Sequence, residues 1–113
     1  MLWSAKQYDC IWDTFYGSCD SDTQEKIDQR LAFLLQRGNQ SGEPVTKHLD
    51  DGIFELRAKN ARLLFYFGGS RTVVFVHALT KKRSNVPRAD INLAKQRRAE
   101  IGAGRTTPNA FTH

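Results

Sequence analysis

Three apolar segments in the middle of the chain constrain its fold more than any other feature. They cover residues 53–57, 61–67 and 72–79, and only the short turns Lys59-Asn60 and Gly68-Gly69-Ser70 separate them. Segments of this length, rich in Val, Phe and Leu and joined by turn residues, are typical of antiparallel strands linked as hairpins. The sequence therefore predicts a three-stranded β-meander.

The residues before the meander predict two helices. Apolar residues at helical spacing, ending before Gly17, indicate the first: Tyr8, Ile11, Trp12, Phe15 and Tyr16. The second extends from about Asp22 to Arg37, with Ser21 as its N-cap, Gln24 completing a capping box, and Gly38 as its stop. We expect a short strand over residues 1–5 and a loop over residues 38–46.

The remaining segments complete an α+β domain. Pro87 suits the first position of a last helix over about residues 87–101, and residues 103–113 are expected to form a flexible tail. The expected architecture is a small antiparallel β-meander with two N-terminal helices on one face and a C-terminal helix. In an α+β domain of this order, we expect the helices to pack against one face of the sheet. We expect one domain over residues 1–102, followed by the tail.

The composition excludes several classes of protein. The longest uninterrupted apolar stretch is Leu63–Phe67, whereas a membrane helix needs about 20 apolar residues. The first ten residues lack the pattern of a secretory signal. Cys10 and Cys19 have no His or Cys at zinc-ligand spacing, so we expect two idle thiols and no metal or cofactor. Together these features favour a cytoplasmic protein without a membrane partner.

Charge is distributed unevenly along the chain. The whole chain carries 17 Lys and Arg against 12 Asp and Glu. Residues 1–56 have a net charge of −5, while residues 57–113 have a net charge of +10 and only two acidic side chains, Asp90 and Glu100. A basic half of this kind favours a polyanionic partner, with nucleic acid as the first candidate. A basic face that serves only solubility, or that binds an acidic protein, is the alternative.

The hairpin geometry predicts a basic site on one face of the meander. A two-residue loop at Lys59-Asn60 sets Arg57 opposite Arg62, and a two-residue loop at Gly69-Ser70 sets Arg62 opposite His77. Like charges directly opposite each other destabilise a sheet, and a phosphate would remove that cost. Glu55 could instead supply the counter-charge.

Side-chain alternation divides the meander into two faces. The core face is expected to carry Phe54, Leu56, Leu63, Phe65, Phe67, Val74 and Val76. The face of the predicted site carries Glu55, Arg57, Arg62, Tyr66 and His77, with Leu64 and Phe75 between them.

The same residues carry a family resemblance. The segments DGIFELR, ARLLFYF and VVFVHALTKKRSNVP, followed by a basic helix, resemble the RelE/HigB-like toxins of bacterial type II toxin–antitoxin systems, and most closely their phage-derived HigB-like branch. The resemblance covers about residues 21–100. It implies a small twisted sheet with two helices on one face and a basic cleft on the other. It also implies an mRNA interferase that cuts messages in the ribosomal A site.

The implied partners are those of such toxins. They are a cognate antitoxin, commonly a helix-turn-helix protein in this branch, with which the toxin forms a hetero-oligomer. They also include mRNA and the ribosome, and operator DNA bound through the antitoxin. A ParE-like toxin of the same fold, which poisons DNA gyrase by binding, is one alternative, and a nucleic-acid-binding module that has lost toxicity is another.

Metal-free RNA cleavage needs cations at the phosphate, a base and an acid. Arg57 and Arg62 suit the cationic role because a guanidinium meets phosphate oxygens bidentately. Histidine is the usual side chain for proton transfer at cellular pH, which suits His77 to that role, although a buried core histidine is the competing interpretation. Lys81 and Lys82 could bind phosphate or donate a proton, or could simply form a solvated turn.

Other residues are expected at the rim of the site. Arg83 and Arg88 extend the basic surface, and Lys47 and His48 stand where related toxins carry basic residues. Tyr66 could stack on a base or pack beneath the site. Several relatives place a Tyr or His from the C-terminus in the site, whereas this tail offers only Phe111 and His113, so the general base stays unassigned.

Overall fold

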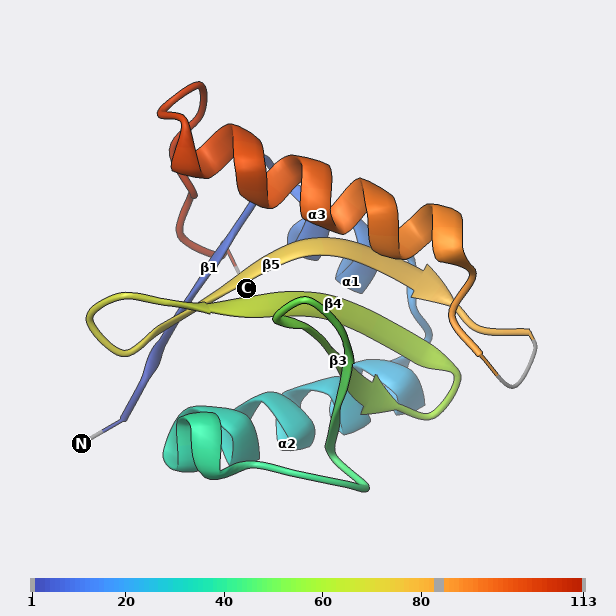
Figure 1. Ribbon diagram of the computed structural model, residues 1–113. Helices are drawn as coiled ribbons and strands as arrows, with labels where there is room; N and C mark the ends of the chain where they lie inside the picture. Colours follow the sequence, from blue (N-terminus) through green and yellow to red (C-terminus); the bar gives the residue numbers. More distant parts are fainter. Residues whose placement is uncertain (1, 83–84, 113) are drawn as a thin grey trace.

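The computed structural model describes residues 2–82 and 85–112 and shows a five-stranded mixed sheet with helices on both faces (Figure 1). The chain forms β1 (Ser4–Gln7), α1 (Ile11–Ser18), α2 (Ser21–Arg37), the short 3-10 helix η1 (Gly38–Gln40), β2 (Thr46–Asp50), β3 (Ile53–Ala58), β4 (Ala61–Gly68), β5 (Thr72–Thr80) and α3 (Arg88–Gly102). The strand order is β1-β5-β4-β3-β2. β1 runs parallel to β5, and the other neighbours are antiparallel.

The α+β class, the meander and the three helices predicted from the sequence are confirmed, and the sheet gains a strand at each edge. β1 lies at residues 4–7 rather than 1–5. β2 was not predicted, because TKHLD has one β-branched residue, Thr46, and neither Phe, Tyr nor Trp to mark a strand. Its pairing with β3 makes it a strand, and it carries Lys47 and His48 into the sheet.

The sheet separates two apolar cores. On one face α1 and α2 pack on a cluster that includes Trp12, Leu34, Leu56 and Phe65. On the other face α3 contributes Ile91 and Ala94 to a smaller cluster that also contains the following sheet residues: Ile53, Leu64, Val74 and Val76. The expectation that helices cover a single face was therefore wrong. α3 crosses the second face, as Figure 1 shows.

The helix ends differ from the predictions for local reasons. Asp20, not Ser21, caps α2, because its carboxylate accepts a hydrogen bond from Thr23 N–H at 2.8 Å. α1 starts only at Ile11 and includes Gly17. The buried Gln7 side chain accepts hydrogen bonds from Trp12 and Asp13 N–H, and so replaces an N-cap at the start of α1.

The β4–β5 hairpin corrects the predicted register. Gly68 pairs with Thr72, which leaves a three-residue loop, and a bulge follows between Leu64 and Phe65. Each irregularity shifts the pairing by one residue, so Arg62 faces Leu79 rather than His77.

The longer loop also exchanges the faces of the first part of β5. Val74 and Val76 point to the core beneath α3, and Phe75 points to the core beneath α1 and α2, the reverse of the prediction. The predicted faces of β3 and β4 are confirmed, because their register depends only on the Lys59-Asn60 turn.

The segment after α3 returns to the sheet. Gln7 and Asn109 exchange two backbone hydrogen bonds of 2.8 Å, and the Phe111 ring stacks on Trp12 with centroids 4.4 Å apart. These contacts tie the segment expected to be a flexible tail to β1 and α1. His113 lies outside the described residues.

Candidate functional site

Arg57 on β3 and Arg62 on β4 lie directly opposite each other, as predicted. Glu55, two residues before Arg57 on the same face, supplies the counter-charge. Its Oε2 accepts a hydrogen bond from Arg57 Nε at 2.6 Å and lies 3.8 Å from Arg62 Nε. The Glu55 side chain is only 3% exposed, so one buried carboxylate holds two guanidinium groups together.

The two arginines differ in the contacts that their Nη1 atoms make. Arg62 Nη1 donates to the carbonyl oxygens of Lys59 and Ala61 at 2.7 and 2.8 Å, and its side chain is 11% exposed. Its buried Nε has no hydrogen-bond partner among the residues that the structure describes. Arg57 is 25% exposed, and its Nη1 lies 3.3 Å from the solvent-exposed Glu43 carboxylate. Arg62 is therefore anchored to the β3–β4 turn, whereas Arg57 faces solvent.

Arg57 and Glu55 line a cavity of about 350 Å³ between β2, β3 and the start of α3. Its other lining residues are Lys47, His48, Leu49, Asn85, Val86, Arg88 and Ile91. A second cavity, of about 320 Å³, lies next to the first, and Asn85 lines both of them. Its other lining residues are Leu79, Thr80, Lys81, Lys82, Pro87 and Asp90. We call these two cavities together the basic cleft.

Lys81 lies at the end of β5, where its N–H donates to Asn60 O at 2.7 Å. Burial, and next the charge of Arg62, lower the pKa of the Lys81 ammonium below its ordinary value. Glu55 acts in the opposite direction, while Arg57 and Lys47 add to the lowering. The structure therefore brings Lys81 close to the arginine pair, as the sequence predicted.

The predicted rim residues lie partly in the cleft. Lys47 on β2 faces it, and His48 turns its ring against Phe54 and accepts a hydrogen bond from Gly52 N–H at 3.1 Å. Arg88 Nη1 donates to Asp50 at 2.7 Å and is 63% exposed. Lys82 lines the second cavity, and Arg83 lies outside the described residues.

His77 lies apart from the arginine pair. It pairs with the fully buried Leu64, which stands between it and Glu55 in the sheet. Its Nε2 is 2.6 Å from Asp90 Oδ1, and its Nδ1 is 3.4 Å from Arg97 Nη1. Both ring nitrogens thus face α3.

Tyr66 is distant from Arg62 and does not line the cleft. It lies four residues along β4 from Arg62, roughly 13 Å at strand geometry. It packs in the core beneath α3, where burial raises the pKa of its hydroxyl.

Sequence reasoning missed three polar residues that shape this face. Glu43 came from a segment expected to be a plain loop, and Asp90 and Asn85 gave no signal in the sequence. Asn85 and Asp90 are placed by the docking of α3, to which its buried apolar residues and the ion pairs from Asp50 to Arg88 and Lys95 contribute. Glu43 precedes β2 and reaches the site through its contact with Arg57. Within residues 2–82 and 85–112, no group of acidic, His or Cys side chains could hold a metal ion. No helix in that part of the chain is long and apolar enough to cross a bilayer.

A family model decides the relationship of this chain to known proteins. The model of the phage derived protein Gp49-like family (DUF891) matches residues 15–99. The chain belongs to this family. A search of curated proteins finds no match.

Solved structures of RelE toxins share the fold. A free mutant of Escherichia coli RelE has a TM-score of 0.55 at 16% identity, covering 86% of this chain and 98% of that one. RelE in a RelB–RelE antitoxin–toxin complex from Methanococcus jannaschii has a TM-score of 0.52 at 13% identity, covering 66% and 88%. The RelBE2 complex from Mycobacterium tuberculosis scores 0.45 at 20% identity, covering 72% and 100%. The expected phage-derived family is thereby shown by the family model, and the expected RelE-like fold is confirmed by the two structures with TM-scores above 0.5.

Proposed function

We propose that this Gp49-like chain is the toxin of a type II toxin–antitoxin system and cuts mRNA on the ribosome. The observation that carries the proposal is the pair Arg57 and Arg62, held by buried Glu55, beside Lys81 at an open cleft. A cluster with more cationic than anionic side chains, partly removed from water, is suited to the charge of a phosphate in its transition state.

The cleft suits cleavage by the RNA's own 2′-hydroxyl. In that reaction the 2′-oxygen bonds to phosphorus, its proton leaves to a base, and the bond to the 5′-oxygen breaks. The products are a 2′,3′-cyclic phosphate and a 5′-hydroxyl end. Arg57, the more exposed arginine, would bind the non-bridging oxygens.

Lys81 would act as the general acid that protonates the leaving group. A protonated amine with a lowered pKa gives up its proton more readily than an ordinary lysine, so Lys81 suits protonation of the departing 5′-oxygen. Arg62 would hold Glu55 and the β3–β4 turn in place through its contacts with the Glu55 carboxylate and the turn carbonyls. His77 would contribute by positioning α3, which forms a wall of the cleft.

The rim of the cleft would hold the rest of the message. Lys47, Lys82 and Arg88 line the two cavities and would bind neighbouring phosphates, with Arg83 and His48 as further candidate contacts. Tyr66, beneath α3, would support the site by packing and would not stack on a base.

The partner proposed is a cognate antitoxin. Two of the similar structures are RelB–RelE type complexes, which supports an antitoxin that binds this chain as well. We propose a helix-turn-helix antitoxin in a hetero-oligomer that also binds operator DNA, in the cytoplasm where messages are translated.

The test is to map mRNA 5′ ends in cells after induced expression of the wild-type chain, Arg57→Ala or Arg105→Ala. Arg105 is exposed and lies outside the basic cleft, so its variant is the matched control. Discrete cuts within translated messages are expected for the wild type and Arg105→Ala and not for Arg57→Ala. Growth arrest with intact messages would contradict the proposal and would favour a ParE-like action on gyrase.

A further inference from the structure

The second half of β5 forms a sheet edge that no other described strand covers. β1 pairs with β5 only along Thr72–Phe75, whereas β5 continues to Thr80. β4 pairs with β5 on the opposite side over its whole length. Within residues 2–82 and 85–112, residues 77–80 therefore have a strand neighbour on one side only.

The pairing of β5 with β4 determines which backbone groups of this edge point outward. Lys81 N–H bonds to Asn60 O, and in an antiparallel ladder bonded positions alternate with positions that face away. His77 and Leu79 consequently bond to β4, while Ala78 and Thr80 direct their N–H and C=O groups outward. Nothing in the described chain bonds to those outward groups. Their spacing matches the backbone of an extended peptide.

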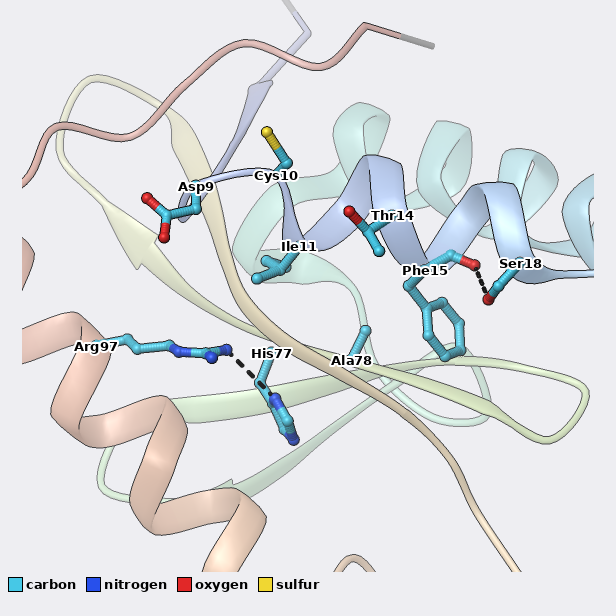
Figure 2. Close-up of a pocket in the computed structure, with 9 residues that line it drawn as sticks. All are labelled: Asp9, Cys10, Ile11, Thr14, Phe15, Ser18, His77, Ala78 and Arg97. Carbon is cyan, nitrogen blue, oxygen red and sulfur yellow. Dashed lines mark hydrogen bonds between the residues drawn. The ribbon is translucent and has the colours of Figure 1, made fainter.

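A groove lies along this edge, between α1 and α3. Figure 2 shows its larger part, a cavity of about 510 Å³ with α1 on one side, β5 as the floor and Arg97 of α3 on the other side. A second cavity of about 370 Å³ shares Phe15 and Ser18 with the first and reaches Thr80 and Lys59. We call the two together the edge groove; it meets the basic cleft only at Thr80, which lines a cavity of each.

The residues that line the edge groove indicate which kind of peptide segment would bind there. Ile11, Phe15 and Ala78 make its middle apolar. Cationic side chains stand at its ends: Arg97 beside Asp9, and Lys59 beside Asp20. Asp20 already accepts the Thr23 N–H, and Arg97 uses Nη1 for Val76 O, which leaves its other N–H groups for a carboxylate. An extended segment with apolar residues in the middle and an acidic residue at an end complements these features.

We propose that an extended segment of the antitoxin lies in the edge groove and adds a strand beside residues 77–80 of β5. The identity of the partner rests on the proposed function, but the groove and its unpaired edge do not depend on RNA cleavage. Binding there would leave the cavity beside Arg57 uncovered by this segment, because the edge groove shares only Thr80 with the basic cleft and no residue with that cavity.

Amide hydrogen exchange, resolved by NMR for the chain alone and in complex with its co-purified antitoxin, tests the proposal. The amides of Ala78 and Thr80 should exchange rapidly in the chain alone and at least tenfold more slowly in the complex. Those of His77 and Leu79 should be slow in both, because β4 already binds them. Equal exchange of Ala78 and Thr80 in both states would overturn the proposal, as would protection of the Ala78 amide, which lies outside the basic cleft, by RNA without antitoxin.

A matched pair of variants gives a second readout. Ala78→Pro removes only an outward N–H, whereas Ala78→Ser retains it with little added volume. Ala78→Pro should weaken antitoxin binding at least tenfold, Ala78→Ser by less than threefold, and both should still cut mRNA. Equal affinities in two folded variants would overturn the added strand; if Ala78→Pro does not fold, the exchange experiment decides. A chain that shows the exchange pattern but leaves mRNA intact would refute the proposed function and not the groove.

Discussion

Arg57 and Arg62 face each other across β3 and β4, and both approach the same Glu55 oxygen, at 2.6 and 3.8 Å. Two like charges at opposed positions repel each other in a sheet. One buried carboxylate offsets this repulsion and fixes the side chains in place. The pair therefore combines a structural interaction with a site for an anion.

Glu55→Ala should destabilise the fold strongly, because it removes the carboxylate that approaches both partly buried guanidinium groups and leaves Arg57 with only the exposed Glu43. We expect a loss of about 2–4 kcal/mol in the free energy of unfolding, measured by urea titration. Added sulfate should restore part of the loss by occupying the site. Glu25→Ala, on the exposed side of α2, should change stability by less than about 0.5 kcal/mol. A Glu55→Ala variant as stable as the wild type would refute the structural role.

The two arginines should separate stability from activity. Arg57→Ala should abolish mRNA cleavage and lower stability by about 1–3 kcal/mol, because it removes the hydrogen bond to the buried Glu55 carboxylate. Arg62→Ala should lower stability more, because its guanidinium holds the carbonyls of Lys59 and Ala61. Parallel urea titrations and cleavage assays compare the two variants. The reverse order of stabilities would contradict the assignment.

Lys81 should give cleavage a basic limb in its pH profile. Its pKa is lowered, so the ammonium loses its proton at a lower pH than an ordinary lysine and the rate falls as the pH rises through that value. Lys81→Arg keeps the charge to higher pH, so this limb should disappear while the rate at neutral pH falls about 100-fold. Lys6→Arg, on the exposed surface of β1, is the control. A profile that Lys81→Arg leaves unchanged would exclude proton donation by Lys81.

His77 and Asp90 should act as a coupled pair that docks α3 on the sheet. Their side chains are 2.6 Å apart, so a double-mutant cycle of His77→Ala and Asp90→Ala should give a coupling free energy of about 1 kcal/mol in unfolding experiments. Both single variants should reduce cleavage indirectly, through the wall of the cleft. Additive effects on stability would show that the contact does not hold α3.

Phe111 should contribute to stability although it comes from the C-terminal segment. Its stacked contact with Trp12 predicts a loss of about 1–2 kcal/mol for Phe111→Ala, measured by thermal unfolding. Leu2→Ala removes an apolar side chain that is 64% exposed and should be nearly neutral. Equal melting temperatures for wild type and Phe111→Ala would show that the segment is not docked in solution.

The meander and the Arg57–Arg62 pair were predictable because a two-residue turn leaves one register. The position of His77 was not, since one loop residue and one bulge moved it from Arg62 to Leu64. Short-range patterns do not specify bulges. Glu43 and Asp90 entered the site region through tertiary docking, for which a single sequence carries no local signal.

The most direct test of the central claim uses purified ribosomes translating a defined message, incubated with the wild-type chain, Arg57→Ala or Arg105→Ala, followed by analysis of the RNA ends. The account predicts cuts that leave a 5′-hydroxyl and a 2′,3′-cyclic phosphate with the wild type and Arg105→Ala, and an intact message with Arg57→Ala. An intact message with the wild-type chain, or equal cutting by Arg57→Ala, would contradict it.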